Sequence, residues 1–331
     1  LRKNLRMNNH ITAIFFDIGG TLRISEGIIG RDPSKIEEII SLISEDISTD
    51  DFIARIHRGE KAYRRMVKPN YIEFSEAELW TRFLLPEYPV DFVRANAVKF
   101  NQLWRDSNPK RVLPDAVDTL RTLHKRGYRL GLISNTTSSI EGHQLLEENG
   151  LTDLFSTVLL SAAFGRRKPH PSIFIQAARE TGLHPSQCAY VGDRPSRDLI
   201  GALQAGYGET IIINVAGYAI DEFDPDDYDP ASDDELVMKP DHYIGQLSEL
   251  LSFYPDINNV RNGSSPQKAY TLYDAALSTM WGVDQDMPFN QTFQVAREAG
   301  ISRFELNHKV SAELFDEFDK DHYYVSSVHD P

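Results

Sequence analysis

The segment Phe16-Asp17-Ile18-Gly19-Gly20-Thr21-Leu22 places an acid and two glycines directly after the apolar run 11–16. That run is short and rich in β-branched and aromatic residues, which predicts a buried strand. An Asp at the carboxyl end of such a strand lies at the sheet edge where open α/β sheets bind their ligands. Taken alone, the segment is more typical of a β-turn whose Asp caps the residues that follow.

Downstream, short apolar runs alternate with helical patterns, which predicts a doubly wound, parallel α/β sheet. Strands are expected at 128–133, 157–160, 187–191, 209–215 and 241–244, and helices at 117–125, 141–149, 171–181, 197–205 and 245–253. Residues 32–108 interrupt the alternation with a purely helical pattern, so we expect an inserted helical cap at about 26–108. Two apolar stripes would form its core: Ile36, Ile39, Ile40 and Ile43, and Phe92, Ala95, Val98 and Phe100–Leu103.

Three further polar segments lie near the ends of predicted strands. Ser134-Asn135 offers a hydroxyl and an amide to phosphate oxygens, although such a pair is more often a helix cap. Gly165-Arg166-Arg167-Lys168-Pro169 is cationic and could neutralise a phosphate, or form a solvated basic loop. Gly192-Asp193 and Asp198 offer two acids five residues apart, which suits a hard cation with oxygen ligands or an ordinary capped turn.

Together and in this order, the four segments resemble the motifs of the haloacid dehalogenase (HAD) superfamily. The shared pattern is Asp-x-x-Gly-Thr, then Ser-Asn, then Lys-Pro, then Gly-Asp-x-x-x-x-Asp. The resemblance covers about residues 10–254, and the helical block corresponds to the helical cap of that superfamily. It implies a Rossmann-like HAD core at 10–25 and 109–254, and a phosphatase-like hydrolase that acts on a small phosphorylated metabolite.

The resemblance also implies a nucleophile and a metal site. Asp17 would attack phosphorus and become an aspartyl-phosphate. Mg²⁺ would be held by the Asp17 carboxylate, the Gly19 backbone carbonyl and Asp193, with Asp198 supporting the metal site. A carboxylate that attacks an anion needs nearby positive charge to cancel their repulsion.

The remaining motif residues would bind the phosphoryl group. Ser134, the backbone of Asn135 and Thr21 would contact its oxygens. Lys168, oriented by Asp198, would neutralise both the nucleophile and the phosphate.

One position departs from the phosphatase pattern of the superfamily. The residue two after the nucleophile is usually a second Asp that acts as general acid and base, and here it is Gly19. A positioned acid or base typically contributes about 10²–10⁴-fold to the rate. Either a cap residue such as His57, Glu60 or Lys61 supplies the proton, or the substrate has a good leaving group, or the domain binds a phosphorylated ligand without turning it over. Haloacid dehalogenation is less favoured, because dehalogenases need no Mg²⁺ and this chain keeps the acidic fourth motif.

Residues 272–331 resemble the start of a sugar phosphate isomerase/epimerase (xylose isomerase-like) TIM barrel. The resemblance rests on Leu277-Ser-Thr-Met-Trp281, Ala296-Arg-Glu-Ala-Gly300, Phe304-Glu-Leu-Asn307 and Val325-Ser-Ser-Val-His-Asp-Pro331. A full barrel needs ~250 residues, so we expect a partial (β/α) barrel segment, joined by a linker at 255–271 and truncated from a bifunctional parent. In that case a sugar phosphate is the natural substrate class, and His308 and His329 would lie at strand ends. The alternative interpretation is that residues 272–331 form an unfinished appendage of marginal stability.

Composition excludes several classes of protein. The net charge is −14, but nine acids fall between residues 221 and 235, which predicts a solvated acidic insertion. The one cysteine, Cys188, excludes an internal disulfide, favours a reducing cytoplasm and lies in a predicted core strand. No basic stripe indicates nucleic acid binding, no apolar run is long enough to span a membrane, and no glycine-rich nucleotide motif is present. The sequence does not determine the oligomeric state.

Overall fold

The computed structural model of this chain describes residues 11–25, 31–215, 239–258, 303–306 and 324–328. The chain divides into two compact units, Leu1–Gln267 and Lys268–Pro331. The division lies inside the predicted linker at 255–271. Among the described residues, no helix is both long and apolar enough to cross a membrane.

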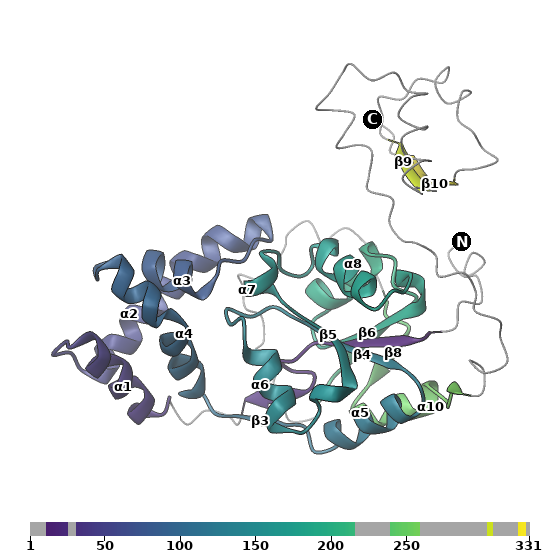
Figure 1. The fold of residues 1–331 in the computed structure, drawn as a ribbon, viewed down its shortest axis with the longest axis horizontal. Helices are drawn as coiled ribbons and strands as arrows, with labels where there is room; N and C mark the ends of the chain where they lie inside the picture. The colour runs from purple at the N-terminus through teal and green to yellow at the C-terminus, as the bar shows by residue number, and fades with distance from the viewer. Residues whose placement is uncertain (1–10, 26–30, 216–238, 259–302, 307–323, 329–331) are drawn as a thin grey trace. The chain divides into compact units, whose positions relative to one another are not determined.

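A six-stranded sheet forms the centre of the first unit, with strand order β5-β4-β1-β6-β7-β8 (Figure 1). Its neighbouring strands all pair in parallel. The strands are β1 (Ala13–Phe16), β4 (Arg129–Ser134), β5 (Phe155–Leu160), β6 (Cys188–Gly192), β7 (Glu209–Ile213) and β8 (His242–Ile244). The predicted parallel α/β sheet is therefore confirmed. β1 is followed at once by Asp17 and lies between β4 and β6, so the end of β1 is flanked by the ends of both neighbours.

The alternation of side chains along β1 divides the core into two parts. Ile14 and Phe16 face one apolar cluster and Ala13 and Phe15 face another, as a two-residue period requires. All four side chains are fully buried, because helices cover both faces of the sheet. In Figure 1, α5 (Ala116–Lys125) and α10 (Leu250–Phe253) lie on one side and α8 (Pro171–Glu180) lies on the other. The remaining core helices are α6 (Glu141–Glu148), α7 (Ser161–Phe164) and α9 (Ile200–Gln204), the last preceded by a π-helical turn at Pro195–Leu199.

The helical block is an insertion with a core of its own. It contains α1 (Pro33–Ile43), α2 (Thr49–Val67), a 3₁₀ turn (Lys68–Asn70), α3 (Glu76–Leu79), a π-helical turn (Trp80–Leu84) and α4 (Val90–Asp106). Two antiparallel strands, β2 (Arg23–Ser25) and β3 (Lys110–Val112), form its entry and exit. The expected stripe on α1 is confirmed, since all four isoleucines are buried.

The expected buried face of α4 is confirmed at Phe100 and Leu103 but wrong at Phe92, Ala95 and Val98. Phe92 and Val98 are exposed, at 36% and 47%. The buried face carries Val93, Ala97, Phe100, Asn101, Leu103 and Trp104. These residues follow the spacing of a helix that packs against α1, α3 and the π-helical turn.

Two strands of the second unit are described. β9 (Arg303–Leu306) and β10 (Tyr324–Val328) pair in parallel. Two of the four segments that carry the resemblance, Leu277–Trp281 and Ala296–Gly300, lie outside the described residues, as do His308, His329 and the acidic segment 221–235. The resemblance of this unit to a TIM barrel therefore stays a prediction.

Candidate functional site

Three parallel strands deliver polar side chains to one edge of the sheet. β1 ends before Asp17, β4 ends at Ser134, and β6 ends before Asp193. Each of these three residues is at most 4% exposed. Asp198 comes from the π-helical turn after β6 and is fully buried. The sheet thus brings together residues that are far apart in the sequence.

Lys168 occupies the centre of this cluster although its backbone belongs to the loop between α7 and α8. Its ammonium nitrogen lies 3.0 Å from Asp17 Oδ1 and 2.6 Å from Asp198 Oδ1. It also donates a hydrogen bond of 2.8 Å to the hydroxyl of Tyr190. An ammonium group has three protons; two of them are hydrogen-bonded, to Asp198 and Tyr190, whereas the contact with Asp17 is an ion pair, and Asp17 Oδ1 has no hydrogen-bond partner among the described residues. The lysine is 1% exposed, and its charge depends on these partners.

The backbone of the lysine is fixed as well. The Asn135 side chain donates to the carbonyl of Lys168 (2.9 Å) and accepts from its N–H (2.7 Å). Because the amide is occupied in this way, the backbone of Asn135 is the part that stays available to a ligand. Thr21, the other expected binding residue, is completely buried, and its hydroxyl has no hydrogen-bond partner in the part of the chain that the structure describes.

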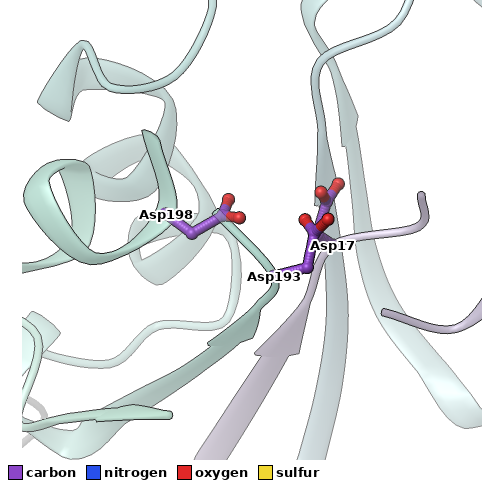
Figure 2. Close-up of side chains that lie close together, drawn as sticks. All are labelled: Asp17, Asp193 and Asp198. Atoms are coloured by element: carbon purple, nitrogen blue, oxygen red, sulfur yellow. The ribbon is translucent and has the colours of Figure 1, made fainter. Parts of the chain in front are cut away.

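Three carboxylates lie close enough to share one cation. Asp17, Asp193 and Asp198 each offer an oxygen, and these oxygens all lie within 4.8 Å of one another. Figure 2 shows Asp17 and Asp193 side by side and Asp198 facing them from the turn. The buried Asp193 Oδ1 has no hydrogen-bond partner among the described residues. An unsatisfied carboxylate oxygen among buried acids fits a hard divalent cation such as Mg²⁺.

The electrostatics of the cluster agree with that fit. Burial, followed by the charges of Asp198 and Asp17, raises the pKa of Asp193 to about 7. Burial also raises the pKa of Asp17, although Lys168 opposes it. Burial works in the same direction on Asp198, but Lys168 and Arg197 more than offset it and lower the pKa of that carboxyl. The cluster therefore holds more negative charge than Lys168 alone compensates.

The two glycine positions after Asp17 differ in whether a larger side chain would fit. Gly20 has φ +74°, and a Cβ there would lie 2.1 Å from Asp193 Oδ2, so only glycine fits. A Cβ on Gly19 would meet no atom of the described residues within 4 Å. The missing acid is consequently not excluded by crowding, because position 19 has room for a side chain.

A cavity of about 150 Å³ lies between the cap and the core, next to Asn135. The core contributes Asn135, Thr136, Thr137 and Arg167, and the cap contributes Glu60, Tyr63, Arg64, Glu73, Leu79, Leu84, Asn101 and Trp104. Of the three cap residues expected as proton donors, Glu60 lines this cavity and accepts a hydrogen bond of 2.8 Å from Trp104 Nε1. His57 and Lys61 are exposed and are not among the lining residues.

Sequence reasoning did not single out Tyr190, Glu73 or Glu141. Each is buried and bonded to a loop of the site, but only through contacts made by the folded chain. Tyr190 lies in an apolar strand, where the sequence pattern predicts only a buried core residue. Cys188, on the same strand, is buried as expected, and burial raises the pKa of its thiol.

The sequence model of the haloacid dehalogenase-like hydrolase family matches residues 11–206, and a related HAD-hydrolase-like model matches residues 165–250. The chain belongs to the haloacid dehalogenase-like hydrolase family. It is 30% identical over 210 residues to a glyceraldehyde 3-phosphate phosphatase of Methanopyrus kandleri, covering 57% of this chain and 85% of that protein. It is 37% identical over 153 residues to haloacid dehalogenase-like hydrolase domain-containing protein 3 of Bos taurus, covering 45% of this chain and 55% of that protein.

Solved structures support the family fold. A 2-haloacid dehalogenase from Pseudomonas syringae pv. Tomato matches with a TM-score of 0.50 and 23% identity, covering 72% of this chain and 96% of that protein. At this identity the match shows the shared fold alone. The chain is thus a hydrolase of this family with a parallel α/β core and helices.

Proposed function

We propose that this chain is a Mg²⁺-dependent phosphatase that hydrolyses a small phosphorylated metabolite through an aspartyl-phosphate on Asp17. The observation that carries the proposal is the position of Lys168 between Asp17 and Asp198, beside a third carboxylate with an unsatisfied oxygen. The similarity to a phosphatase of a three-carbon sugar phosphate in Methanopyrus kandleri supports the same reaction class. The cavity of about 150 Å³ suits an organic group of a few carbons.

The proposed reaction has two displacements at phosphorus. In the first, an Asp17 oxygen attacks phosphorus, the bond to the leaving oxygen breaks, and the freed alcohol takes up a proton. In the second, water attacks the aspartyl-phosphate and releases inorganic phosphate, which restores the carboxylate. Mg²⁺, when bound by Asp17, Asp193 and the Gly19 carbonyl with support from Asp198, would supply Lewis-acid stabilisation of charge at the phosphoryl oxygens.

The protein groups hold and neutralise the phosphoryl group during both steps. The Lys168 ammonium cancels charge on the nucleophile, and Ser134 with the backbone of Asn135 donates to phosphoryl oxygens. Gly19 offers no proton, so the leaving alcohol must draw its proton from water or from a cap group such as Glu60. Turnover should therefore depend strongly on how good the leaving group is.

The test uses the full chain with acetyl phosphate and with p-nitrophenyl phosphate, each with and without Mg²⁺. We expect turnover that requires Mg²⁺ and that Asp17→Asn abolishes. Acid quenching of the wild type should trap phosphoprotein, and Asp17→Asn should trap none. Absence of both turnover and phosphoprotein with these activated substrates would overturn the proposal.

A second candidate follows from Gly19. Without an acid at that position, the domain could bind a phosphorylated ligand and retain little catalysis, within a bifunctional parent that carries a sugar phosphate isomerase/epimerase domain. Titration calorimetry with inorganic phosphate and Mg²⁺ distinguishes the two. Binding without turnover of any activated substrate supports the binding function, whereas binding with turnover supports the phosphatase.

A further inference from the structure

One buried acid of the cap reaches a core helix beside the proposed site. Glu73 lies between the 3₁₀ turn and α3, and its side chain is 1% exposed. Its carboxylate accepts a hydrogen bond from the hydroxyl of Tyr63, within the cap. It accepts another, of 2.8 Å, from Ser161 Oγ at the start of α7 in the core. A carboxylate this buried requires such donors, because leaving it unpaired would be costly.

The same cap segment is also paired with the loop that leads into Lys168. Glu73 N–H donates to the Gly165 carbonyl (3.1 Å), and Arg167 N–H donates to the Tyr71 carbonyl (3.0 Å). The Arg167 side chain lies 3.6 Å from the Glu73 carboxylate. Two backbone hydrogen bonds and one ion pair thus join the cap to the two residues on either side of Arg166, immediately before Lys168.

Ser161 extends the contact to the loop after β4. Its hydroxyl accepts from Thr136 N–H at 2.9 Å, and its single proton has two acceptors in reach. These are the Glu73 carboxylate at 2.8 Å and the Thr136 carbonyl at 3.0 Å. A carboxylate is the stronger acceptor, so the presence of Glu73 decides which bond Ser161 makes.

These contacts form a closed circuit around the proposed site. First, Glu73 is bonded to the 165–167 loop, which leads directly into Lys168. Second, the Asn135 amide joins the backbone of Lys168 to the loop that contains Thr136. Third, Ser161 joins Thr136 back to Glu73. Removing the cap opens the circuit at Glu73. Both loops that would hold the phosphoryl group then lose an anchor.

We propose that Glu73 is a positioning residue that couples docking of the cap to the placement of Lys168 and of the 134–136 loop. Its kinetic consequence rests on the phosphatase function proposed above. Glu73 does not need to touch the substrate for this effect. Small displacements of a catalytic group can cost up to about 10²-fold in rate.

The test compares Glu73→Gln with Glu76→Gln in the full chain. Glu76 is a matched control, because it is also a buried cap acid that binds the core, accepting from the N–H and hydroxyl of Ser139, the latter at 2.8 Å. Among the described residues, its side chain makes no hydrogen bond or ion pair with the 165–168 loop. We expect Glu73→Gln to lower kcat for p-nitrophenyl phosphate by about 10- to 100-fold with KM changed less than about 3-fold. We expect Glu76→Gln to change kcat by less than about 3-fold.

Hydrogen exchange provides a readout that does not depend on turnover. Amides of residues 163–168 and 136 should exchange faster in Glu73→Gln than in Glu76→Gln. If the two variants match in kcat and in exchange, Glu73 only helps to dock the cap and the proposal is wrong. If the wild type shows no turnover, the phosphatase proposal fails, and the exchange difference still decides the role of Glu73. Should Glu73→Gln not fold, Ser161→Ala breaks the same circuit from the core side and should also speed exchange at residue 136.

Discussion

The hydrogen bonds of the Lys168 ammonium fix its position. Tyr190 accepts one ammonium proton, and its own hydroxyl proton has two acceptors in reach, the Ile133 carbonyl at 3.0 Å and Asp198 Oδ1 at 3.2 Å. Because either acceptor can take the hydroxyl proton, the oxygen is free to accept from the lysine. Tyr190 therefore holds Lys168 toward Asp17 without facing a substrate.

Tyr190→Phe should lower kcat by about 10-fold and the free energy of unfolding by about 1–3 kcal/mol, since a buried ammonium proton loses its acceptor. Tyr207→Phe is the control: its hydroxyl is also buried and donates to a backbone carbonyl, that of Phe174, at 2.9 Å. We expect it to lose stability with kcat nearly unchanged. Steady-state kinetics and urea unfolding measure both quantities, and equal losses of kcat in the two variants would contradict the role of Tyr190.

Substitutions at the two neighbouring glycines, Gly19 and Gly20, are expected to have opposite effects on turnover. Gly19→Asp should fold normally, because the space beside it is open, and should raise turnover of substrates with poor leaving groups by about 10²-fold or more. Activated acyl and aryl phosphates should gain much less, since their leaving groups need little acid. Comparing an alkyl phosphate with p-nitrophenyl phosphate measures this difference. A uniform effect on both substrates would show that the new carboxylate does not act as an acid.

Gly20→Ala is the matched substitution one residue later. Its Cβ would fall 2.1 Å from Asp193 Oδ2 in a backbone conformation with φ +74°. We expect this variant to lose Mg²⁺-dependent turnover and Mg²⁺ binding together, measured by kinetics and calorimetry. Normal Mg²⁺ binding would mean that the backbone of the loop relaxes.

Among the elements, the entry and exit strands of the cap depend on one acid at the start of α6. Glu141 is paired with Arg23 of β2, Arg105 of α4 and Lys110 of β3. It also accepts from the Thr136 hydroxyl. Burial alone would raise its pKa, but the three cations more than offset burial and lower the pKa to about 2. Glu141 thus joins both linking strands, the last cap helix and the loop after β4.

Glu141→Gln should consequently lose stability in a pH-dependent way. The carboxylate has a lower pKa in the folded chain than its ordinary value of 4.5, so its contribution is complete above about pH 4.5 and is lost as the pH falls toward 2. At about 1.4 kcal/mol per pKa unit, the loss at pH 7 should be about 3 kcal/mol. Urea unfolding at pH 7 and pH 3.5 checks this. A difference between wild type and variant that does not shrink at the lower pH would contradict it.

At the scale of the whole molecule, the sequence predicts those parts of the fold and of the site that depend on local patterns of residues. Asp17, Ser134 and Asp193 each follow an apolar run, and parallel strands bring the ends of such runs to one edge, so their meeting could be foreseen. Glu73, Glu141 and Tyr190 could not be found in this way, because their partners are up to 118 residues away and no pattern marks the pairing. On α4, the expected stripe shares Phe100 and Leu103 with the buried face but includes the exposed Phe92 and Val98, and packing against α1 and α3 selects Val93 and Ala97 in their place.

The last prediction concerns where the first unit ends. Residues 254–258 complete its core: Tyr254 and Ile257 are buried, the Tyr254 hydroxyl donates to Glu209 (2.8 Å), and the Ile257 N–H donates to the Arg126 carbonyl (2.9 Å). A chain that ends at Asn258 keeps all of these contacts. The melting temperature of its first unit, and its kcat, should therefore match the values measured for the full chain. A chain that ends at Phe253 loses two buried apolar side chains, and at about 2–5 kcal/mol for each large core truncation it should melt far lower. Differential scanning calorimetry compares the two. Equal destabilisation of both truncated chains would show that the first unit depends on residues beyond 258, whereas a stable chain ending at Asn258 would show that the hydrolase core does not depend on them.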